Sequence, residues 1–322
     1  MKHFPKLLLC LALFVFIFSC NKNDAPFECA VPAIVPHEPY SDPVWHPNGQ
    51  LLGFNHKPLA GVSENGIPPC KWFMNYIKPD SVGFYLINRD GTGFKRVTSF
   101  YLQAPSWSPD GKWLAFSLGP NIYKMPFDGT IFDTTKIIKL TTSGGNYYPG
   151  WTSNSDTIYY DSNNDAPAGT SFYSIWKMTS DGSGKLRVTL SAGVGDTRQP
   201  FIGSDNRVYY VGYSKSQPEI LSMYKDGTTQ IQISNNGKNG ARRNPKHYKG
   251  KVFFWDGRLF STPVTQYIPE EIALSGETYD ISRNGEIVYP TFEYGILDKR
   301  FGTLWLINAT GNNKTQLTFN HY

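Results

Sequence analysis

Residues 104–118 read APSWSPDGKWLAFSL, and two other stretches repeat the pattern: DPVWHPNGQLLGF at 42–54 and YPGWTSNSDTIYY at 148–160. Each stretch opens a segment of roughly 45 residues, a period typical of a propeller blade with four short strands. Each segment closes on a second motif, such as LINRDGTGFKRVT at 86–98. We therefore expect a repeat array that forms one closed unit.

The second of these segments shows how a unit is built. Pro109, Asp110 and Gly111 predict a tight turn, because proline presets φ and glycine adopts the left-handed conformation without strain. The strand expected at 112–118 is largely apolar on both faces, so neighbouring sheets should cover it on both sides.

Six such units are expected. They span residues 42–98, 104–141, 148–189, 199–234, 244–274 and 279–318. Helical spacing of apolar residues is almost absent after the N-terminus. We predict an all-β fold, a six-bladed β-propeller with four antiparallel strands per blade, over residues 39–322. A β-sandwich or an open solenoid is the alternative, but an open array would leave exposed sheet edges at its ends.

The string PSWSPDGKWLAF at 105–116 resembles the WD40-like repeat of TolB-type six-bladed β-propellers. The resemblance covers about residues 39–322 and implies the fold, but it names no ligand. TolB proteins also carry an N-terminal α/β domain, and nothing in this chain matches it. The related prolyl oligopeptidases add a hydrolase domain with a serine nucleophile, and this chain has no Gly-x-Ser-x-Gly motif.

The N-terminus predicts a secretion signal over residues 1–19. Lys2 and Lys6 precede an apolar run, residues 7–18, that is too short to span a bilayer. The run ends in a sequence similar to a bacterial lipobox, so Cys20 is the expected site of lipid attachment and residues 20–38 a tether and tail. The alternative is plain cleavage near Ser19, which leaves Cys20 free.

The other cysteines of the mature chain are Cys29 and Cys70. An exported protein meets an oxidising compartment, so we expect a disulfide between them, with two separate thiols as the alternative.

Charge and residue spacing argue against several classes of function. Removing residues 1–19 lowers the net charge from +5 to +3, and the basic residues are spread out, so no nucleic-acid surface is indicated. The histidines are scattered and no cysteine pair has metal-ligand spacing, so we expect neither a cofactor nor a metal site.

One rim of the ring should carry the variable loops. The connections between the second and third strands of each unit differ in length, whereas the Pro-Asp-Gly and Asp-Gly turns on the opposite rim are expected to be short and uniform. Insertions gathered on one face usually mark the binding face of a repeat protein. The candidate ligand-binding residues there are His56, Trp72, Tyr76, Tyr213, Arg242, Arg243, Tyr294 and Arg300.

Each candidate also has a structural interpretation. Trp72 and Tyr76 could form a platform for a sugar or an anchor for a protein, or could simply pack their long insertion onto the blade. Arg242 and Arg243 could bind a carboxylate or phosphate, or form an exposed basic turn.

We expect a non-catalytic binding or scaffold propeller of the bacterial cell envelope. It would be anchored by lipid, with the outer membrane as the expected location, and would contact an envelope protein or a glycan through the variable rim. The alternative is a polysaccharide lyase or hydrolase. Oligogalacturonate lyases resemble this class of propeller, but they depend on clustered metal-binding histidines. Here His56 and His247 would have to meet at the channel mouth.

Overall fold

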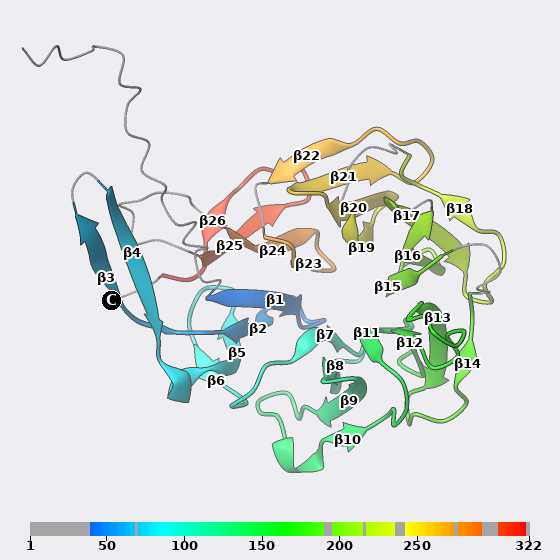
Figure 1. The fold of residues 1–322 in the computed structure, drawn as a ribbon, viewed down its shortest axis with the longest axis horizontal. Coiled ribbons are helices and arrows are strands. Elements are labelled where there is room, and N and C mark those ends of the chain that lie inside the picture. The colour runs from blue at the N-terminus through cyan, green and yellow to red at the C-terminus, as the bar shows by residue number, and fades with distance from the viewer. Residues whose placement is uncertain are drawn as a thin grey trace, which may run out of the picture.

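The structure, a computed structural model, describes residues 39–67, 70–189, 195–214, 217–235, 242–273, 276–291 and 302–319. These residues form six four-stranded antiparallel sheets arranged in a ring, and each sheet is made of consecutive strands. Figure 1 shows the ring viewed along its axis, with one inner strand of every sheet beside the central opening. The predicted six-bladed β-propeller is confirmed.

The first three blades follow the predicted units. Blade one contains β1 (Tyr40–Trp45), β2 (Leu51–His56), β5 (Gly83–Asn88) and β6 (Lys95–Arg96). Blade two contains β7 (Gln103–Trp107), β8 (Trp113–Leu118), β9 (Asn121–Pro126) and β10 (Ile138–Lys139). Blade three contains β11 (Asn146–Trp151), β12 (Thr157–Ser162), β13 (Ser174–Thr179) and β14 (Leu186–Arg187).

The last three blades repeat the arrangement. Blade four contains β15 (Thr197–Ile202), β16 (Arg207–Ser214), β17 (Gln217–Tyr224) and β18 (Ile231–Gln232). Blade five contains β19 (Arg243–Tyr248), β20 (Lys251–Trp255), β21 (Leu259–Pro263) and β22 (Glu270–Ala273). Blade six contains β23 (Asp280–Ile281), β24 (Glu286–Thr291), β25 (Thr303–Asn308) and β26 (Thr315–Gln316).

Buried apolar clusters lie between all neighbouring blades and hold the ring together. Successive residues of a second strand enter opposite clusters: Tyr160 packs toward blade two, and Tyr159 packs toward blade four. The same alternation places Ala115 on one side of β8 and Phe116 on the other. Side chains alternate across a strand. A strand whose residues are apolar on both sides therefore belongs to a sheet that is covered on both faces.

The inner strands share a β-bulge at the repeat proline. In five blades the residue before this proline has a left-handed φ between 46° and 56°, and the strand register shifts there. These residues are Asp42, Ala104, Tyr148, Gln199 and Asn244. Proline has no N–H to leave unpaired on the inner edge of a sheet, and a bulge redirects the neighbouring side chains. The repeat therefore shapes the wall of the central channel.

Side chains from adjacent blades satisfy the backbone N–H groups of these bulges. The N–H of Asn244 donates to Gln199 Oε1 (2.8 Å), and the N–H of Gln199 donates to Asp161 Oδ2 (3.0 Å). The N–H of Asp42 donates to Thr278 Oγ1 (3.0 Å), across the junction of the first and last blades. Hydrogen bonds thus join neighbouring blades at the channel wall. Further from the channel, the apolar clusters join them.

In the described part of the chain no strand is exchanged between blades one and six, and side chains link these two blades. Asp280 stands in β23 where other inner strands have proline, and its Oδ2 accepts the N–H of Trp45 (2.8 Å). Its Oδ1 lies 3.2 Å from Lys246 Nζ. Arg89 and Glu286 add a two-pronged ion pair between the same two blades.

We predict that Asp280→Ala lowers the free energy of unfolding by about 1–3 kcal/mol, because the N–H of Trp45 would stay buried without an acceptor. Asp280→Asn keeps an acceptor and should cost less. Urea unfolding of both variants measures the difference. Equal losses for the two would show that the hydrogen bond to Trp45 does not hold the closure.

The long insertion of blade one is a separate two-stranded sheet, made of β3 (Leu59–Ile67) and β4 (Cys70–Ile77), followed by the 3₁₀ turn η1 (Pro79–Ser81). Figure 1 shows this hairpin projecting outward from the ring beside blade one. The insertion is therefore an ordered element at the periphery of the ring.

The expectation of uniform turns on the opposite rim is wrong in blade two. Residues 127–137 form a longer connection there, which contains η2 (Thr134–Lys136). Phe132 folds back so that its ring lies 5.1 Å from that of Trp107 and 4.8 Å from that of Phe127. The extra length adds an aromatic cluster that packs against the blade.

Among the helices of the described residues, none is long and apolar enough to cross a membrane.

Candidate functional site

The two faces of the ring differ in the loops that they carry. Because successive strands run in opposite directions, all connections between the second and third strands lie on one face, together with the connections between blades. We call this the insertion face; it includes residues 57–82, 119–120, 163–173 and 256–258. The opposite face, with turns such as 108–112, is the turn face.

The loop at 163–173 is fastened at both ends to blades three and four. Arg187 NH1 of blade three lies 2.6 Å from Asp165 Oδ2, and the backbone N–H of Tyr173 donates to Asp196 Oδ1. Phe172 sits between these anchors with half of its surface exposed. A large apolar side chain is thus held on the insertion face by a loop with fixed ends.

Phe172 is followed in the chain by Tyr173, whose ring lies among aromatic and charged side chains. The ring centroids of Tyr147 and Tyr173 are 5.9 Å apart with planes tilted by 50°. The Arg198 guanidinium lies 3.9 Å above the centre of the Tyr173 ring and also pairs with Asp196. We call this group, Tyr147, Phe172, Tyr173, Asp196 and Arg198, the aromatic corner.

A second charged group lies on the insertion face at blades five and six. Arg243 NH1 is 2.8 Å from Glu277 Oε1, and this carboxylate raises the pKa of Arg243 above its ordinary value through a hydrogen bond. The Asn244 side chain donates to the carbonyl of Glu277 (2.8 Å). Tyr213, at the end of β16, contributes to the electrostatic surroundings of Arg243. The mouth therefore offers both signs of charge beside tyrosine rings.

Two buried carboxyl groups lie just inside the mouth. Burial raises the pKa of Asp161 to about 7, although the N–H of Gln199 donates to it. Burial also raises the pKa of Asp42, whose Oδ2 accepts hydrogen bonds from Asn55 (3.0 Å) and Ser41 (3.1 Å). Both groups accept hydrogen bonds within the fold, so they act first as structural acceptors of the channel wall.

Below the mouth, the inner strands of all six blades enclose a cavity of about 660 Å³. The bulge residues, including Asp42, Tyr148 and Gln199, line it at the end nearer the insertion face. The short turns between first and second strands line it at the turn face. A volume of this size is typical of a small-molecule site.

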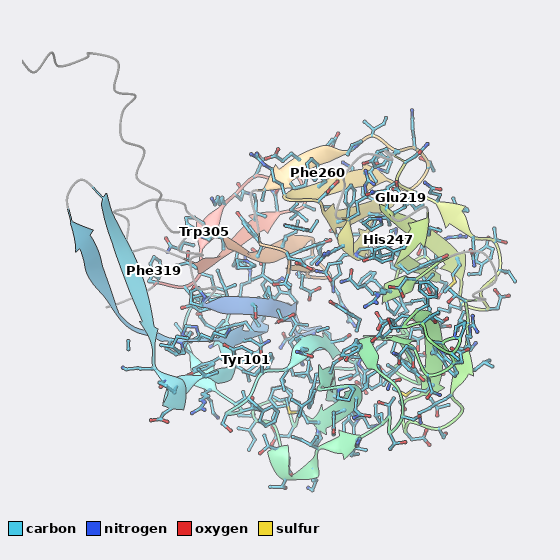
Figure 2. All side chains as sticks on the ribbon, in the orientation of Figure 1. Tyr101, Glu219, His247, Phe260, Trp305 and Phe319 are labelled. Atoms are coloured by element: carbon cyan, nitrogen blue, oxygen red, sulfur yellow. The ribbon has the colours of Figure 1, made fainter. Side chains whose placement is uncertain are left out.

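The structure places the predicted site residues in different environments. Tyr213 and Arg243 lie together at the mouth. Arg242 is only 1% exposed, and its guanidinium is 2.8 Å from Glu219 Oε2, so it binds a carboxylate of its own chain and presents no surface to a ligand. Figure 2 labels Glu219 between blades four and five, within the ring of blades.

His56 is also internal. It is 7% exposed, its ring stacks on Tyr40 at 4.3 Å, and its Nδ1 lies 2.7 Å from the carbonyl oxygen of Pro39. Burial lowers the pKa of His56 to about 4. The imidazole is therefore neutral near pH 7, and it packs against aromatic rings of its own blade, including those of Tyr85 and Phe94.

The remaining predictions are only partly covered by the structure. Trp72 and Tyr76 lie on β4 of the projecting hairpin, opposite Asn65 and Gly61, away from the channel. Tyr294, Arg300, Cys20 and Cys29 lie outside the described residues. The Cys29–Cys70 disulfide therefore stays a prediction.

Sequence reasoning missed the aromatic corner. Tyr147 and Arg198 each stand two residues before a repeat proline, as Arg243 does in blade five. In each case that position is the first or second residue of the inner strand, next to the mouth. The residue two positions before the repeat proline could therefore have identified these side chains from the sequence.

The arrangement of histidines does not resemble a catalytic cluster. His56 lies beside the insertion, whereas His247 lies at the turn face, 3.8 Å from Asp205 in the turn after β15. In the described part of the chain, no group of three or more His, Cys, Asp or Glu side chains could hold a metal ion.

Comparisons with known proteins support the fold. No family model and no curated sequence matches the chain. TolB from Acinetobacter baumannii matches with a TM-score of 0.56 and 16% identity, over 72% of this chain and 58% of that chain. A putative TolB from Agrobacterium tumefaciens matches with a TM-score of 0.50 and 17% identity, over 87% and 81%. Oligogalacturonate lyase from Vibrio parahaemolyticus matches with a TM-score of 0.50 and 10% identity, over 87% and 78%. At these identities the likeness concerns the propeller fold alone.

Proposed function

We propose that this protein is a non-catalytic binding propeller of the bacterial cell envelope that contacts a protein partner through the aromatic corner. The observation that carries the proposal is the exposure of Phe172 on a loop whose ends are fixed by Asp165 and Asp196. A large apolar side chain already held in place loses little conformational freedom when it binds. Aromatic and arginine side chains are the residues most often found at the centre of protein interfaces.

A protein partner fits this surface better than a glycan. A sugar ring stacks on an open, flat aromatic face, but Arg198 covers one face of Tyr173, and Tyr147 is tilted by 50° from it. The corner instead offers an apolar anchor beside a charged pair, which is the mixture that protein interfaces use.

The catalytic alternative has less support. The lyase neighbour shares the fold at 10% identity. In the described residues the two histidines that would have to meet lie on opposite faces, and burial lowers the pKa values of both.

The location rests on the N-terminal sequence. We propose that residues 1–19 are a signal peptide, that Cys20 carries lipid, and that residues 20–38 tether the propeller of residues 39–322 to the outer membrane. A lipid chain with such a tether anchors a protein without spanning the bilayer.

We predict that Phe172→Ser weakens partner binding by at least about tenfold, the size expected for loss of an interface anchor. Ile131→Ser is the matched control, because Ile131 is exposed to the same degree (49%) but lies on the turn face. The measurement is the amount of partner that copurifies with each variant from cross-linked envelope membranes. Equal recovery with both variants would contradict the proposal.

A further inference from the structure

The turn-face half of the central cavity carries an excess of positive charge. Its histidine, lysine, arginine and acidic lining residues are His46, Lys246, His247, Lys249, Asp280 and Arg283. Asp280 is the only acidic residue in that group. The cavity is therefore basic at the face opposite the aromatic corner.

Arg283 extends across the mouth of this half. It begins in the turn after β23 of blade six, and its NH2 donates to the carbonyl oxygen of Pro109 (2.7 Å) in blade two. Blade one lies between these two blades in the ring, so the side chain reaches beyond the neighbouring blade. Within the described residues its guanidinium has no carboxylate at ion-pair distance, and a neutral carbonyl does not compensate its charge.

Of the two lysines, Lys246 has an acidic partner among the described residues and Lys249 has none. Lys246 Nζ lies 3.2 Å from Asp280, but that carboxylate also accepts the N–H of Trp45. Lys249 Nζ lies 5.3 Å from the centre of the Tyr248 ring, and no acidic side chain of the described residues is within ion-pair distance of it. One carboxylate thus faces three permanent cations.

His247 supplies a buried polar group without a partner. Its side chain is 4% exposed and stacks on Tyr209, with ring centroids 5.0 Å apart. Within the described residues neither ring nitrogen has a hydrogen-bond partner, and Asp205 at 3.8 Å is too far away to accept one. Figure 2 shows His247 beside the inner strand β19, at the edge of the central opening. Buried polar groups of folded proteins are nearly always hydrogen-bonded. Within the described residues, His247 in the cavity wall is an exception.

We propose that the turn-face half of the cavity is a binding site for a small organic oxyanion, a carboxylate or a phosphate. Arg283 would bind the anion through a charge-assisted, two-pronged contact that matches its planar donors. Lys246 and Lys249 would add compact positive charges. The site lies on the face opposite the aromatic corner, so it does not depend on the proposed protein contact.

Titration calorimetry of the full chain with inorganic phosphate and with citrate, at constant ionic strength, tests the proposal. We expect saturable binding of at least one anion and none of glucose, which is a neutral probe. The anion that binds more tightly identifies the class, phosphate or carboxylate. Arg283→Gln should weaken binding by at least about tenfold, which corresponds to about 1.4 kcal/mol.

Arg258→Gln is the matched control, because Arg258 pairs with Glu271 in blade five and does not line the cavity. It should bind the anion as the unaltered chain does. Lys249→Gln, at an exposed turn position, provides a second test if Arg283→Gln does not fold. Absence of binding for both anions, or equal affinities in the Arg283 and Arg258 variants, would overturn the proposal.

Discussion

Arg242→Met should lower the free energy of unfolding by about 3–5 kcal/mol, the usual cost of leaving one member of a buried ion pair without its partner. Arg242 joins two blades: NH1 lies 2.8 Å from Glu219 of blade four, and NH2 lies 3.3 Å from the Tyr267 hydroxyl of blade five. Both charged side chains are almost fully buried. Loss of the cation would leave the Glu219 carboxylate in a site with little water to solvate it.

The next residue along the chain is the matched control. Arg243 makes an ion pair of the same length with Glu277, but its side chain is 43% exposed. Exposed ion pairs contribute at most about 1 kcal/mol, so Arg243→Met should change the unfolding free energy by no more than that. Urea unfolding measures both variants. The double variant Arg242→Met, Glu219→Leu should recover part of the loss, because it also removes the buried carboxylate. Equal losses for the two arginine variants would contradict this role.

Asp161→Asn should stabilise the protein at pH 8 relative to the unaltered chain. The pKa of Asp161 rises from 3.8 in the unfolded chain to about 7 in the folded protein, because burial disfavours the carboxylate. Between these two values the folded state binds the proton more tightly, so the stability of the unaltered chain falls as the pH rises from about 4 to about 7. Asparagine stays neutral, and its side-chain oxygen can still accept the N–H of Gln199.

The advantage of Asp161→Asn should therefore grow with pH and level off above the folded pKa. Its size at pH 8 is on the order of 4 kcal/mol, at about 1.4 kcal/mol for each pKa unit. Unfolding free energies of both proteins at pH 4.5 and at pH 8 give the measurement. Asp165→Asn, which alters a partly exposed ion pair with Arg187, should change stability by less than about 1 kcal/mol. A constant difference between Asp161→Asn and the unaltered chain at both pH values would show that this carboxyl does not titrate between them.

The blades could be predicted because their signals are local and repeated. The turn at Pro109, Asp110 and Gly111 and the two-sided apolar strand at 113–118 determine one blade, and similar segments determine the others. The contacts that close the ring could not be predicted from the sequence. Asp280 was recognisable as a departure from the proline pattern, but its bond to Trp45 joins residues more than 200 positions apart in sequence.

The candidate site was only partly predictable for the same reason. Tyr213 and Arg243 were predicted on the rim of variable loops because loop order places them there, and they lie on that face. Whether a charged side chain faces solvent depends on contacts from other blades: Arg242 is buried by Glu219, and its neighbour Arg243 is not. The aromatic corner brings together side chains from two blades and the loop at 163–173, and no single stretch of sequence contains that arrangement.

Site-specific photo-cross-linking in envelope membranes tests the central claim, that partners bind the insertion face of this propeller, most directly. A photoreactive residue is placed at Phe172 in one protein and at Ile131 in another, so that equally exposed positions on opposite faces are compared. The account predicts a discrete cross-linked protein from position 172 and none from position 131. A cross-link that forms only from position 131, or equally from both positions, would contradict it.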